Sequence, residues 1–206
     1  MKTFAFPLLF LLLLVSACDS EPEKQPQQKP PAVALNDSAT KISARGDSLS
    51  YAYADMLYDE AVSLDSNYYI AYWNKLACET ELHFYAKALA TARELIRLRP
   101  GNPDHRITAG MLAQHTGDTA LAEKYYDEGI ALFRSITDTS PVTSRKYYSM
   151  MTMYGLSLIV AYHTSEGDSV LAKVIANRQD TLSRNLARKF YGKSRDELIA
   201  AMEGKQ

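Results

Sequence analysis

The stretch GMLAQHTGDTALAEKYYDEGIAL, residues 110–132, has the apolar spacing of amphipathic helices, yet it contains three glycines. A glycine in a helix interior costs about 1 kcal/mol relative to alanine, so Gly110, Gly117 and Gly129 each need a structural reason. A helix end explains one glycine, because glycine adopts a left-handed conformation without strain. Close approach of neighbouring helices explains the other two. The stretch is therefore predicted to be two packed helices joined at Gly117.

The same pattern recurs upstream at a fixed interval. Segments 51–67, 85–102 and 119–133 align on a shared alanine column, whose members Ala54, Ala88 and Ala122 recur with a period of about 34 residues. Two apolar columns keep the same interval: Val62, Ile96 and Ile130, and Leu64, Leu98 and Leu132. Such a period indicates a helical repeat in which each unit buries its apolar face against the next.

These residues resemble the tetratricopeptide repeat (TPR), a 34-residue pair of antiparallel helices. The best unit is 103–136, with Gly110 at the small position of the first helix and Ala122 at the close crossing of the second. Asn102, which precedes a proline, and Asp118 are the expected N-caps. The resemblance implies an all-α fold: a right-handed superhelix of antiparallel helix pairs, a TPR-like α-solenoid, with C-terminal capping helices.

Neighbouring units depart from the family pattern. The unit 69–102 carries Lys75 and Leu76 where the family usually has leucine and glycine, and it lacks a glycine turn, so looser or rotated packing is expected. The first unit is expected to contribute only one helix, 48–64, because the residues before it are polar.

A longer fourth unit is expected from about Thr143. Its turn is placed at 166–168 and its crossing alanine at Ala172. The step from Ala122 to Ala172 is 50 instead of 34, which implies an insertion of length 16. The insertion is expected in the loop around 140–141 and in a lengthened helix.

That lengthened helix is expected over 144–165 and contains YYSMMTMYGLSLIVAY, residues 147–162. Sixteen apolar-rich residues fall short of the roughly 20 that span a membrane, so a core helix is predicted. Segments 180–192 and 194–205 predict two short amphipathic helices that cover the end of the array, the second with a capping box of Ser194 and Glu197.

The amino terminus reads as a bacterial export signal. Lys2 precedes an apolar run over 8–15, which ends in small residues before Cys18. The sequence LVSAC resembles the lipobox of bacterial lipoproteins. The resemblance implies removal of residues 1–17, lipidation of Cys18 with fatty acids such as palmitate, and a membrane anchor in the bacterial cell envelope. It leaves open the periplasmic side of the inner or outer membrane and the cell surface.

Residues 18–47 are expected to be a lipidated cysteine followed by a flexible Pro/Gln-rich tether. Four of the eight prolines lie within 19–31, and no aromatic residue occurs between Cys18 and Tyr51. A composition of this kind buries too little apolar surface to offset chain ordering. The TPR-like helical domain is therefore placed at 48–206.

The sequence shows no motif that carries catalysis. The formal net charge is −1 without a basic cluster, which argues against nucleic acid. Glu79 and His83 lie one helical turn apart, but no second His-acid pair has comparable spacing, so no metal site is predicted. Cys78 lies among apolar neighbours and is expected to be an inert buried thiol. The chain is predicted to be no enzyme and to need no cofactor.

A partner groove is what the resemblance implies instead, because the first helix of each TPR pair lines the concave face and binds a protein or peptide. Carried over position by position, the groove residues are Ile70, Trp73, Asn74, Ala77, Thr80 and Glu81, followed by Asp104, Ile107, Thr108, Met111, Gln114 and His115. Trp73, the only tryptophan, is a candidate anchor, since aromatic residues are over-represented in binding hot spots. Packing between helices is the alternative role for Trp73.

Family members that bind the terminal carboxylate of a partner place several Lys, Arg and Asn residues along the groove, because a desolvated anion needs charge-assisted donors. The predicted groove has few such residues, so a peptide of basic or aromatic character is expected instead. The alternative function is a small-ligand or enzyme site in the insertion, near Tyr147, Tyr148 and Tyr154, which a pocket with convergent polar groups would support.

Overall fold

The computed structural model describes residues 29–141, 145–177 and 180–202, and every regular element in these ranges is an α-helix. The helices are α1 (Pro31–Ser43), α2 (Ser48–Leu64), α3 (Tyr69–Glu81), α4 (Tyr85–Leu98), α5 (Pro103–His115), α6 (Thr119–Thr139), α7 (Arg145–Val160), α8 (Thr164–Ala176), α9 (Thr181–Phe190) and α10 (Arg195–Met202). The predicted all-α class is confirmed.

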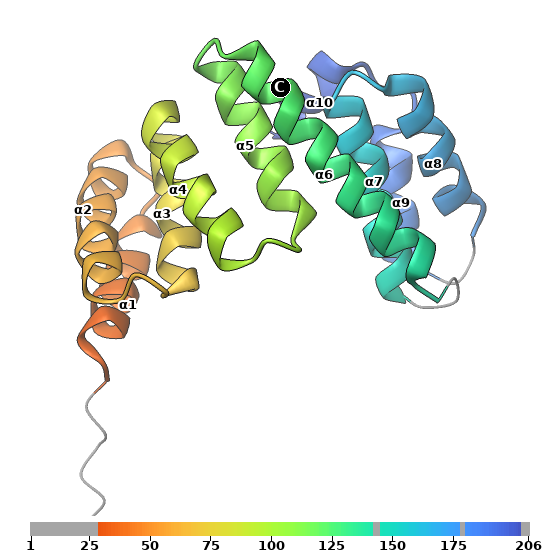
Figure 1. Ribbon diagram of the computed structural model, residues 1–206. Helices are drawn as coiled ribbons and strands as arrows, with labels where there is room; N and C mark the ends of the chain where they lie inside the picture. Colours follow the sequence, from red (N-terminus) through yellow and green to blue (C-terminus); the bar gives the residue numbers. More distant parts are fainter. Residues whose placement is uncertain (1–28, 142–144, 178–179, 203–206) are drawn as a thin grey trace, which may run out of the picture.

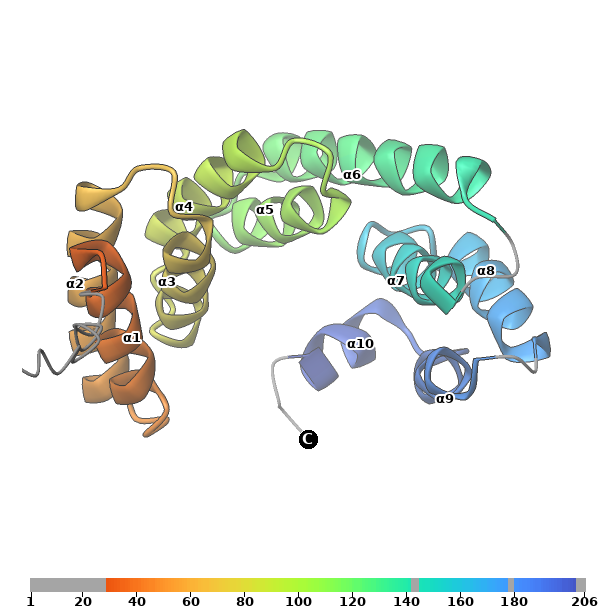
Figure 2. The ribbon, with the colours of Figure 1, turned by 90° about the horizontal axis from the view of Figure 1, so that it is seen from below.

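The helices form an arc of antiparallel pairs (Figure 1). Seen along its axis, α2, α4 and α6 lie on the outer side of the arc, whereas α3, α5 and α7 lie on the inner side (Figure 2). The short α10 lies in the hollow of the arc. This arrangement is an α-solenoid whose concave face is lined by the first helix of each pair.

The predicted unit 103–136 forms as α5 and α6. Asn102 caps α5 by accepting a hydrogen bond from the backbone N–H of Asp104 at 3.1 Å, and Asp118 caps α6 by accepting one from Leu121 at 3.0 Å. Gly117 has φ of +84° in the turn between them. Both caps and the glycine turn are confirmed.

The two remaining glycines of this stretch lie where side chains of neighbouring helices come close. A Cβ on Gly110 would be 2.6 Å from the ring of Tyr126, and a Cβ on Gly129 would be 2.7 Å from Cδ1 of Ile107. Each distance is shorter than van der Waals contact allows. The prediction that these glycines permit close packing is therefore confirmed.

The α3–α4 turn has the same backbone conformation as its glycine-containing counterpart. His83 takes the left-handed conformation with φ of +58°, at the position that Gly117 occupies one repeat later. The N–H of Phe84 bonds to the carbonyl of Glu79 at 2.8 Å, as that of Asp118 bonds to Ala113 at 3.0 Å. A non-glycine residue thus adopts the same turn.

The fourth helix pair begins its turn earlier than predicted. Tyr162, with φ of +68°, is the turn residue, whereas 166–168 lie inside α8. Gly167 makes the close crossing, since its Cβ would lie 2.6 Å from the carbonyl oxygen of Gly155, whereas Ala172 is exposed. The predicted turn at 166–168 and the predicted crossing at Ala172 were wrong. A tyrosine occupies the turn position where glycine was expected, and the sequence EGD, which looks like a glycine turn, lies within α8.

The corrected register changes the insertion. Gly155 precedes Gly167 by the same interval as Gly110 precedes Ala122, and the step from the earlier pair to the later one is 45. Relative to the repeat, the insertion therefore has length 11 rather than 16. Part of it lengthens α6 to Thr139, and α7 ends at Val160 rather than near 165.

Residues 31–43 were predicted to belong to the tether, and here the prediction was wrong because they form α1. Ala39 is fully buried against α2, and the hydroxyls of Thr40 and Tyr58 lie 3.0 Å apart. Pro31 suits the first turn of a helix. The polar composition is compatible with packing because alanines supply the contact face. Residues 1–28, including Cys18 and the signal, lie outside the described residues.

The two last helices are confirmed within the described residues, but α10 lies in the hollow of the arc rather than over its end. In the capping box, the N–H of Ser194 donates to the Glu197 carboxylate at 2.8 Å, and the N–H of Glu197 donates to the Ser194 hydroxyl at 3.2 Å. Helix α7 is a core helix, with Leu158 and Ile159 fully buried. In the described ranges, none of the helices has the length and apolarity that crossing a membrane requires.

Candidate partner groove on the concave face

The predicted groove residues divide by exposure. Six are exposed on α3 and α5: Ile70, Trp73, Ala77, Thr80, Glu81 and His115. Five are half-buried: Asn74, Asp104, Thr108, Met111 and Gln114. One, Ile107, is buried. Helices α3 and α5 both lie on the inner side of the arc (Figure 2), and the exposed members of the set all belong to these two helices.

Ile107 does not belong to that surface. Its side chain packs on Gly129 of α6, so that Cδ1 would be 2.7 Å from a Cβ there. The position of Ile107 in the family repeat predicted a groove residue. Because Gly129 has no side chain, Ile107 instead packs between α5 and α6. Its assignment to the groove was wrong.

Asn74 lies on the concave side but is engaged by α1. Its side-chain amide donates to Oδ1 of Asn36 at 3.0 Å and to the Thr40 hydroxyl at 3.4 Å. Asn36 is itself buried. Asn74 therefore holds α1 against α3, a role that sequence reasoning missed because it placed no helix before residue 48.

Gln114 joins the groove to the C-terminal helix. Its amide nitrogen donates to the Tyr162 hydroxyl at 2.6 Å, and its oxygen accepts from the Tyr126 hydroxyl at 3.1 Å and from the guanidinium of Arg195. A half-buried amide with these partners is a fixed part of the wall rather than an adaptable contact.

Helix α10 forms the third side of the groove. The guanidinium of Arg195 also donates to the Val160 carbonyl at 2.6 Å and lies 4.1 Å over the Tyr162 ring, while Leu198 is fully buried. Between α5 and α10 lies a pocket of about 440 Å³, lined by Met111, Gln114, His115, Arg195, Asp196 and Ile199. Sequence reasoning gave α10 only a capping role and so missed its residues.

Trp73 is 46% exposed, and its ring contacts the buried ring of His105. Its ring centroid lies 5.7 Å from that of His105, whose Nε2 lies 3.1 Å from the Tyr69 hydroxyl. Burial, followed by the charges of Arg99 and Arg106, lowers the pKa of His105 to about 4. The histidine is therefore neutral at physiological pH, and Trp73 presents a supported aromatic surface to the groove.

The far end of the groove is aromatic as well. The rings of Tyr85 and His115 stack with centroids 4.3 Å apart, and Phe84 is exposed beside them. These three residues and Lys87 line a second pocket of about 470 Å³. His115 lines both pockets, so the apolar surface continues from α10 to the α3–α4 turn.

Acidic side chains border this surface. Glu81 and Asp196 are exposed, and Asp104 is half-buried, where burial raises the pKa of its carboxyl. The arginine that lines the first pocket, Arg195, is occupied by Gln114 and Val160. The groove thus combines apolar and aromatic side chains with polar ones, and the carboxylates of Glu81, Asp104 and Asp196 lie along it.

The alternative site near the long helix is less developed. A pocket of about 360 Å³ lies between α7 and α8, lined by Tyr147, Tyr148, Met151, Lys173, Val174 and Asn177. Lys173 is the one charged side chain among the described residues that line it. Tyr154 is not part of this pocket and is held by Arg134 at 3.3 Å. Within the pocket the Asn177 amide donates to the Tyr148 hydroxyl, and the described lining holds neither a carboxylate nor a histidine.

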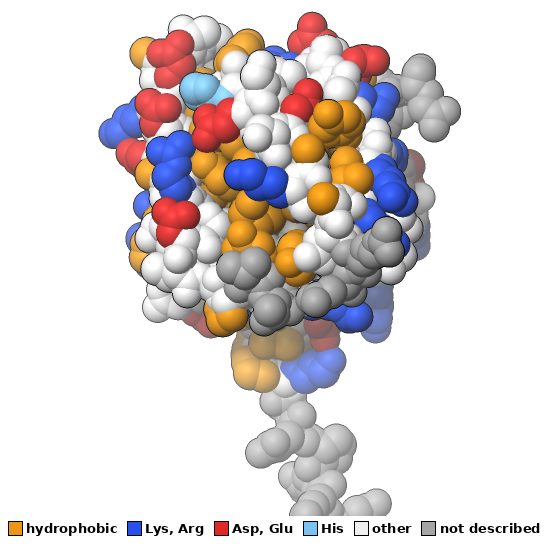
Figure 3. All heavy atoms as spheres, turned by 90° about the vertical axis from the view of Figure 1, so that its right-hand side faces the viewer, with side chains coloured by type: hydrophobic (Ala, Val, Ile, Leu, Met, Phe, Trp, Pro, Cys, Tyr) orange, Lys and Arg blue, Asp and Glu red, His pale blue; other side chains and the backbone are white. Residues whose placement is uncertain are grey.

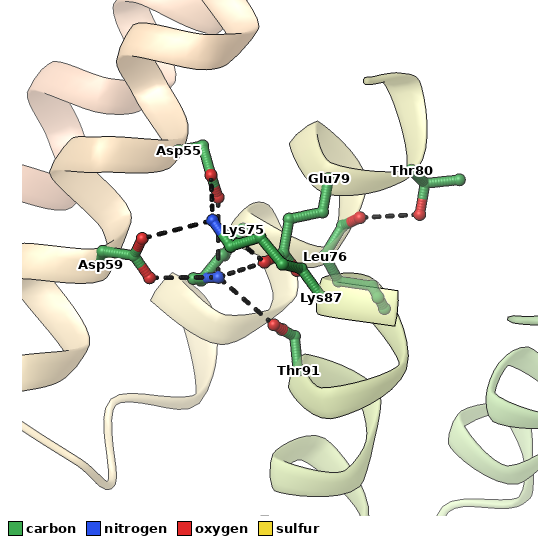
Figure 4. Close-up of polar contacts among 8 residues, drawn as sticks. All are labelled: Asp55, Asp59, Lys75, Leu76, Glu79, Thr80, Lys87 and Thr91. Atoms are coloured by element: carbon green, nitrogen blue, oxygen red, sulfur yellow. Dashed lines mark hydrogen bonds and ion pairs between the residues drawn. The ribbon is translucent and has the colours of Figure 1, made fainter. Parts of the chain in front are cut away.

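A buried ionic cluster between α2, α3 and α4 was not predicted (Figure 4). Lys75 bonds to Glu79 and lies 3.1 Å from Asp59 and 3.6 Å from Asp55, while Lys87 lies 2.8 Å from Asp55. Burial raises the pKa of Glu79 despite its bond to Lys75. The one sequence signal was a lysine at a position where the family has leucine.

The cluster also bears on Glu79, His83 and Cys78, which the sequence analysis considered as a possible metal pair and as a buried thiol. Glu79 is occupied by Lys75, whereas His83 is exposed and its Nδ1 lies 2.9 Å from the Tyr85 hydroxyl. The described residues contain no group of three potential metal ligands. Cys78 is buried, and burial together with the carboxylates of Asp55 and Glu79 raises the pKa of its thiol to about 11. The predicted burial of this thiol is confirmed, and its raised pKa is consistent with the expected low reactivity.

Comparison of the sequence with known protein families and with curated proteins gives no match. Similarity appears at the level of structure. The chain resembles the Yersinia enterocolitica type III secretion translocator chaperone SycD with a TM-score of 0.51 and 16% identity, over 68% of this chain and 97% of that one. It resembles the MamA RS-1 ArsTM double mutant with a TM-score of 0.50 and 15% identity, over 81% and 80%. YrrB, described as a TPR protein with an unusual peptide-binding site, aligns with a TM-score of 0.47 and 18% identity over 85% and 86%.

At these identities the likeness defines the fold alone. Together with the 34-residue spacing of α3–α4 and α5–α6, it places the chain in the class of TPR-like α-solenoids. Fold by itself does not fix function, which has to be argued from the groove.

Proposed function

We propose that this protein is a membrane-anchored lipoprotein of the bacterial cell envelope that acts as an interaction scaffold and holds a protein or peptide partner in its concave groove. The observation that carries the proposal is the concave surface of α3, α5 and α10, where Trp73 is exposed on α3 and Met111 lines the pocket of about 440 Å³ between α5 and α10. Binding sites typically combine an aromatic anchor with a polar border.

The chemistry of the border selects the partner. With acidic groups at Glu81, Asp104 and Asp196 around an apolar floor, we infer a peptide segment that carries an aromatic or aliphatic anchor and flanking Lys or Arg residues. Complementary charge sets specificity and association rate more than affinity. Because α10 closes one side, the segment enters between α3 and α10.

The anchor can be tested with a pooled array of peptides. Trp73→Ala is expected to weaken the best binders by at least about tenfold, because truncation of a hot-spot aromatic costs about 2 kcal/mol. Fluorescence anisotropy with labelled peptides measures the loss. Leu182→Ala on α9 is the matched control, since Leu182 is also exposed and lies outside the groove. Equal binding by wild type and Trp73→Ala would remove Trp73 from the site.

The anchoring part of the proposal rests on the lipobox-like LVSAC before Cys18. Cys18→Ser is expected to abolish labelling by a palmitate analogue in a bacterial host and to release the protein from the membrane fraction, since one or more acyl chains supply the attachment. Cys78→Ser, which changes the buried thiol, is the control and should label normally. Labelling of the Cys18→Ser protein at the wild-type level would contradict the anchor.

A further inference from the structure

An exposed apolar face runs along α2 at the amino-terminal end of the array. Leu49 and Met56 are exposed by 81% and 66%, and Tyr53 and Leu64 are exposed beside them. Their spacing places them on one side of the helix, together with exposed Glu60. Of the three acidic residues of α2, Asp55 and Asp59 pair with Lys75 and Lys87, so Glu60 supplies the negative charge of this side. We call the four apolar residues and Glu60 the α2 face.

The opposite end of the array has an apolar surface bordered by basic residues. Ala172, Ile175 and Ala176 of α8, together with Arg188 and Tyr191, line a pocket of about 410 Å³ between α8 and α9. Helix α9 contains three basic residues and no acidic one. Figure 3 looks onto this end, where hydrophobic side chains gather in the middle, with Lys and Arg on either side and Asp and Glu toward the top and left. We call the five pocket residues the α8–α9 end.

The charge difference extends beyond these two ends to the longer amino-terminal and the shorter carboxyl-terminal part of the described chain. Residues 29–141 carry 15 acidic and 11 basic side chains, whereas residues 145–177 and 180–202 together carry 8 basic and 5 acidic ones. Figure 1 shows α2 and α9 at opposite ends of the arc. The two apolar surfaces are therefore complementary in charge and too far apart to meet within one molecule.

We propose that the α2 face of one copy of this chain docks on the α8–α9 end of a second copy, with Met56 over the pocket and Glu60 facing Arg188. The contact joins two different surfaces and so runs head to tail, which allows a chain of copies to extend. Because single-helix faces are small, we expect weak association, with a dissociation constant in the micromolar range. The contact leaves the concave groove open and does not depend on the proposed function.

Sedimentation velocity of the full chain in detergent, over a concentration series, tests the contact. Wild type is expected to associate with increasing concentration. Glu60→Arg and Arg188→Glu each place like charges across the contact and are expected to weaken self-association about tenfold. An equimolar mixture of the two variants is expected to regain wild-type association, because each introduced charge then faces its opposite on the other variant.

The matched control is Lys124→Glu, an exposed charge reversal on α6 away from both ends of the array, which should associate like wild type. The proposal is overturned if wild type stays monomeric at several hundred micromolar. It is also overturned if Arg188→Glu associates normally while Glu60→Arg does not, since the α2 faces would then pair with each other. Failure of the mixture to recover has the same consequence. All variants carry the same amino terminus, so insertion into micelles is common to them.

Discussion

Lys75→Ala is expected to lower the free energy of unfolding by about 3–5 kcal/mol, because it removes the partner of a fully buried carboxylate. Lys75 and Glu79 lie between three helices, with side-chain exposures of 7% and 0%. Loss of the ammonium leaves Glu79 with the Thr91 hydroxyl and the more distant Lys87 at 4.0 Å. Urea unfolding followed by circular dichroism measures the change.

The double variant Lys75→Leu with Glu79→Leu separates the cost of an unpaired charge from the value of the pair. It is expected to unfold within about 1–2 kcal/mol of wild type, since apolar residues of similar volume often replace a buried ion pair without loss. Asp55 keeps Lys87 at 2.8 Å in this variant. A double variant as unstable as Lys75→Ala would show that the cluster itself, rather than its completeness, stabilises the array.

The pH dependence of the stability of Lys75→Ala tests independently whether the unpaired carboxylate of Glu79 causes the loss. Burial raises the pKa of Glu79, and removal of Lys75 raises it further, so that the folded variant binds a proton at a pH where the unfolded chain does not. The Lys75→Ala variant is thus expected to regain stability relative to wild type as the pH falls from neutrality toward 4.5, the ordinary value for glutamate.

The middle of the array was predictable because its local signals coincide with its packing. Asn102 with a following proline, Gly117 and Ala122 mark a helix start, a turn and a crossing at the family spacing, and each has that role in the structure. The turn of the fourth pair was predicted at the wrong residues, because Tyr162 adopts the left-handed conformation that the sequence analysis expected only of a glycine. A wrong turn residue displaced the whole pair.

Helix α1 and the third wall of the groove depend on contacts between residues far apart in the sequence. Asn36 is buried because Asn74, 38 residues later, bonds to it, and a polar segment gives no sign of such a partner. Arg195 bonds to Gln114 across 81 residues and places α10 in the hollow. Periodicity along one helix cannot indicate either pairing, so the groove residues of α3 and α5 were predicted while those of α10 were not.

The corrected register of the fourth pair makes a second strong prediction at Gly167. Gly167→Ala is expected to destabilise the protein by about 3 kcal/mol, at the upper end of the usual cost of overpacking. The added Cβ would lie 2.6 Å from the carbonyl oxygen of Gly155 and 3.2 Å from the backbone nitrogen of Ile159. Backbone atoms of a packed helix cannot rotate away, so α7 and α8 would have to separate.

Gly101→Ala is the matched control, because a Cβ there meets nothing within 4 Å and the backbone has no positive φ. It is expected to be neutral or to stabilise by about 0.4–1 kcal/mol through the unfolded chain. Gly110→Ala should lie between the two, since its added Cβ meets the Tyr126 ring at 2.6 Å and a side chain can shift where a backbone cannot. Thermal unfolding of the three variants measures the order. A Gly167→Ala protein as stable as Gly101→Ala would mean that α7 and α8 do not cross at Gly155, and the corrected register of the fourth pair would then be wrong.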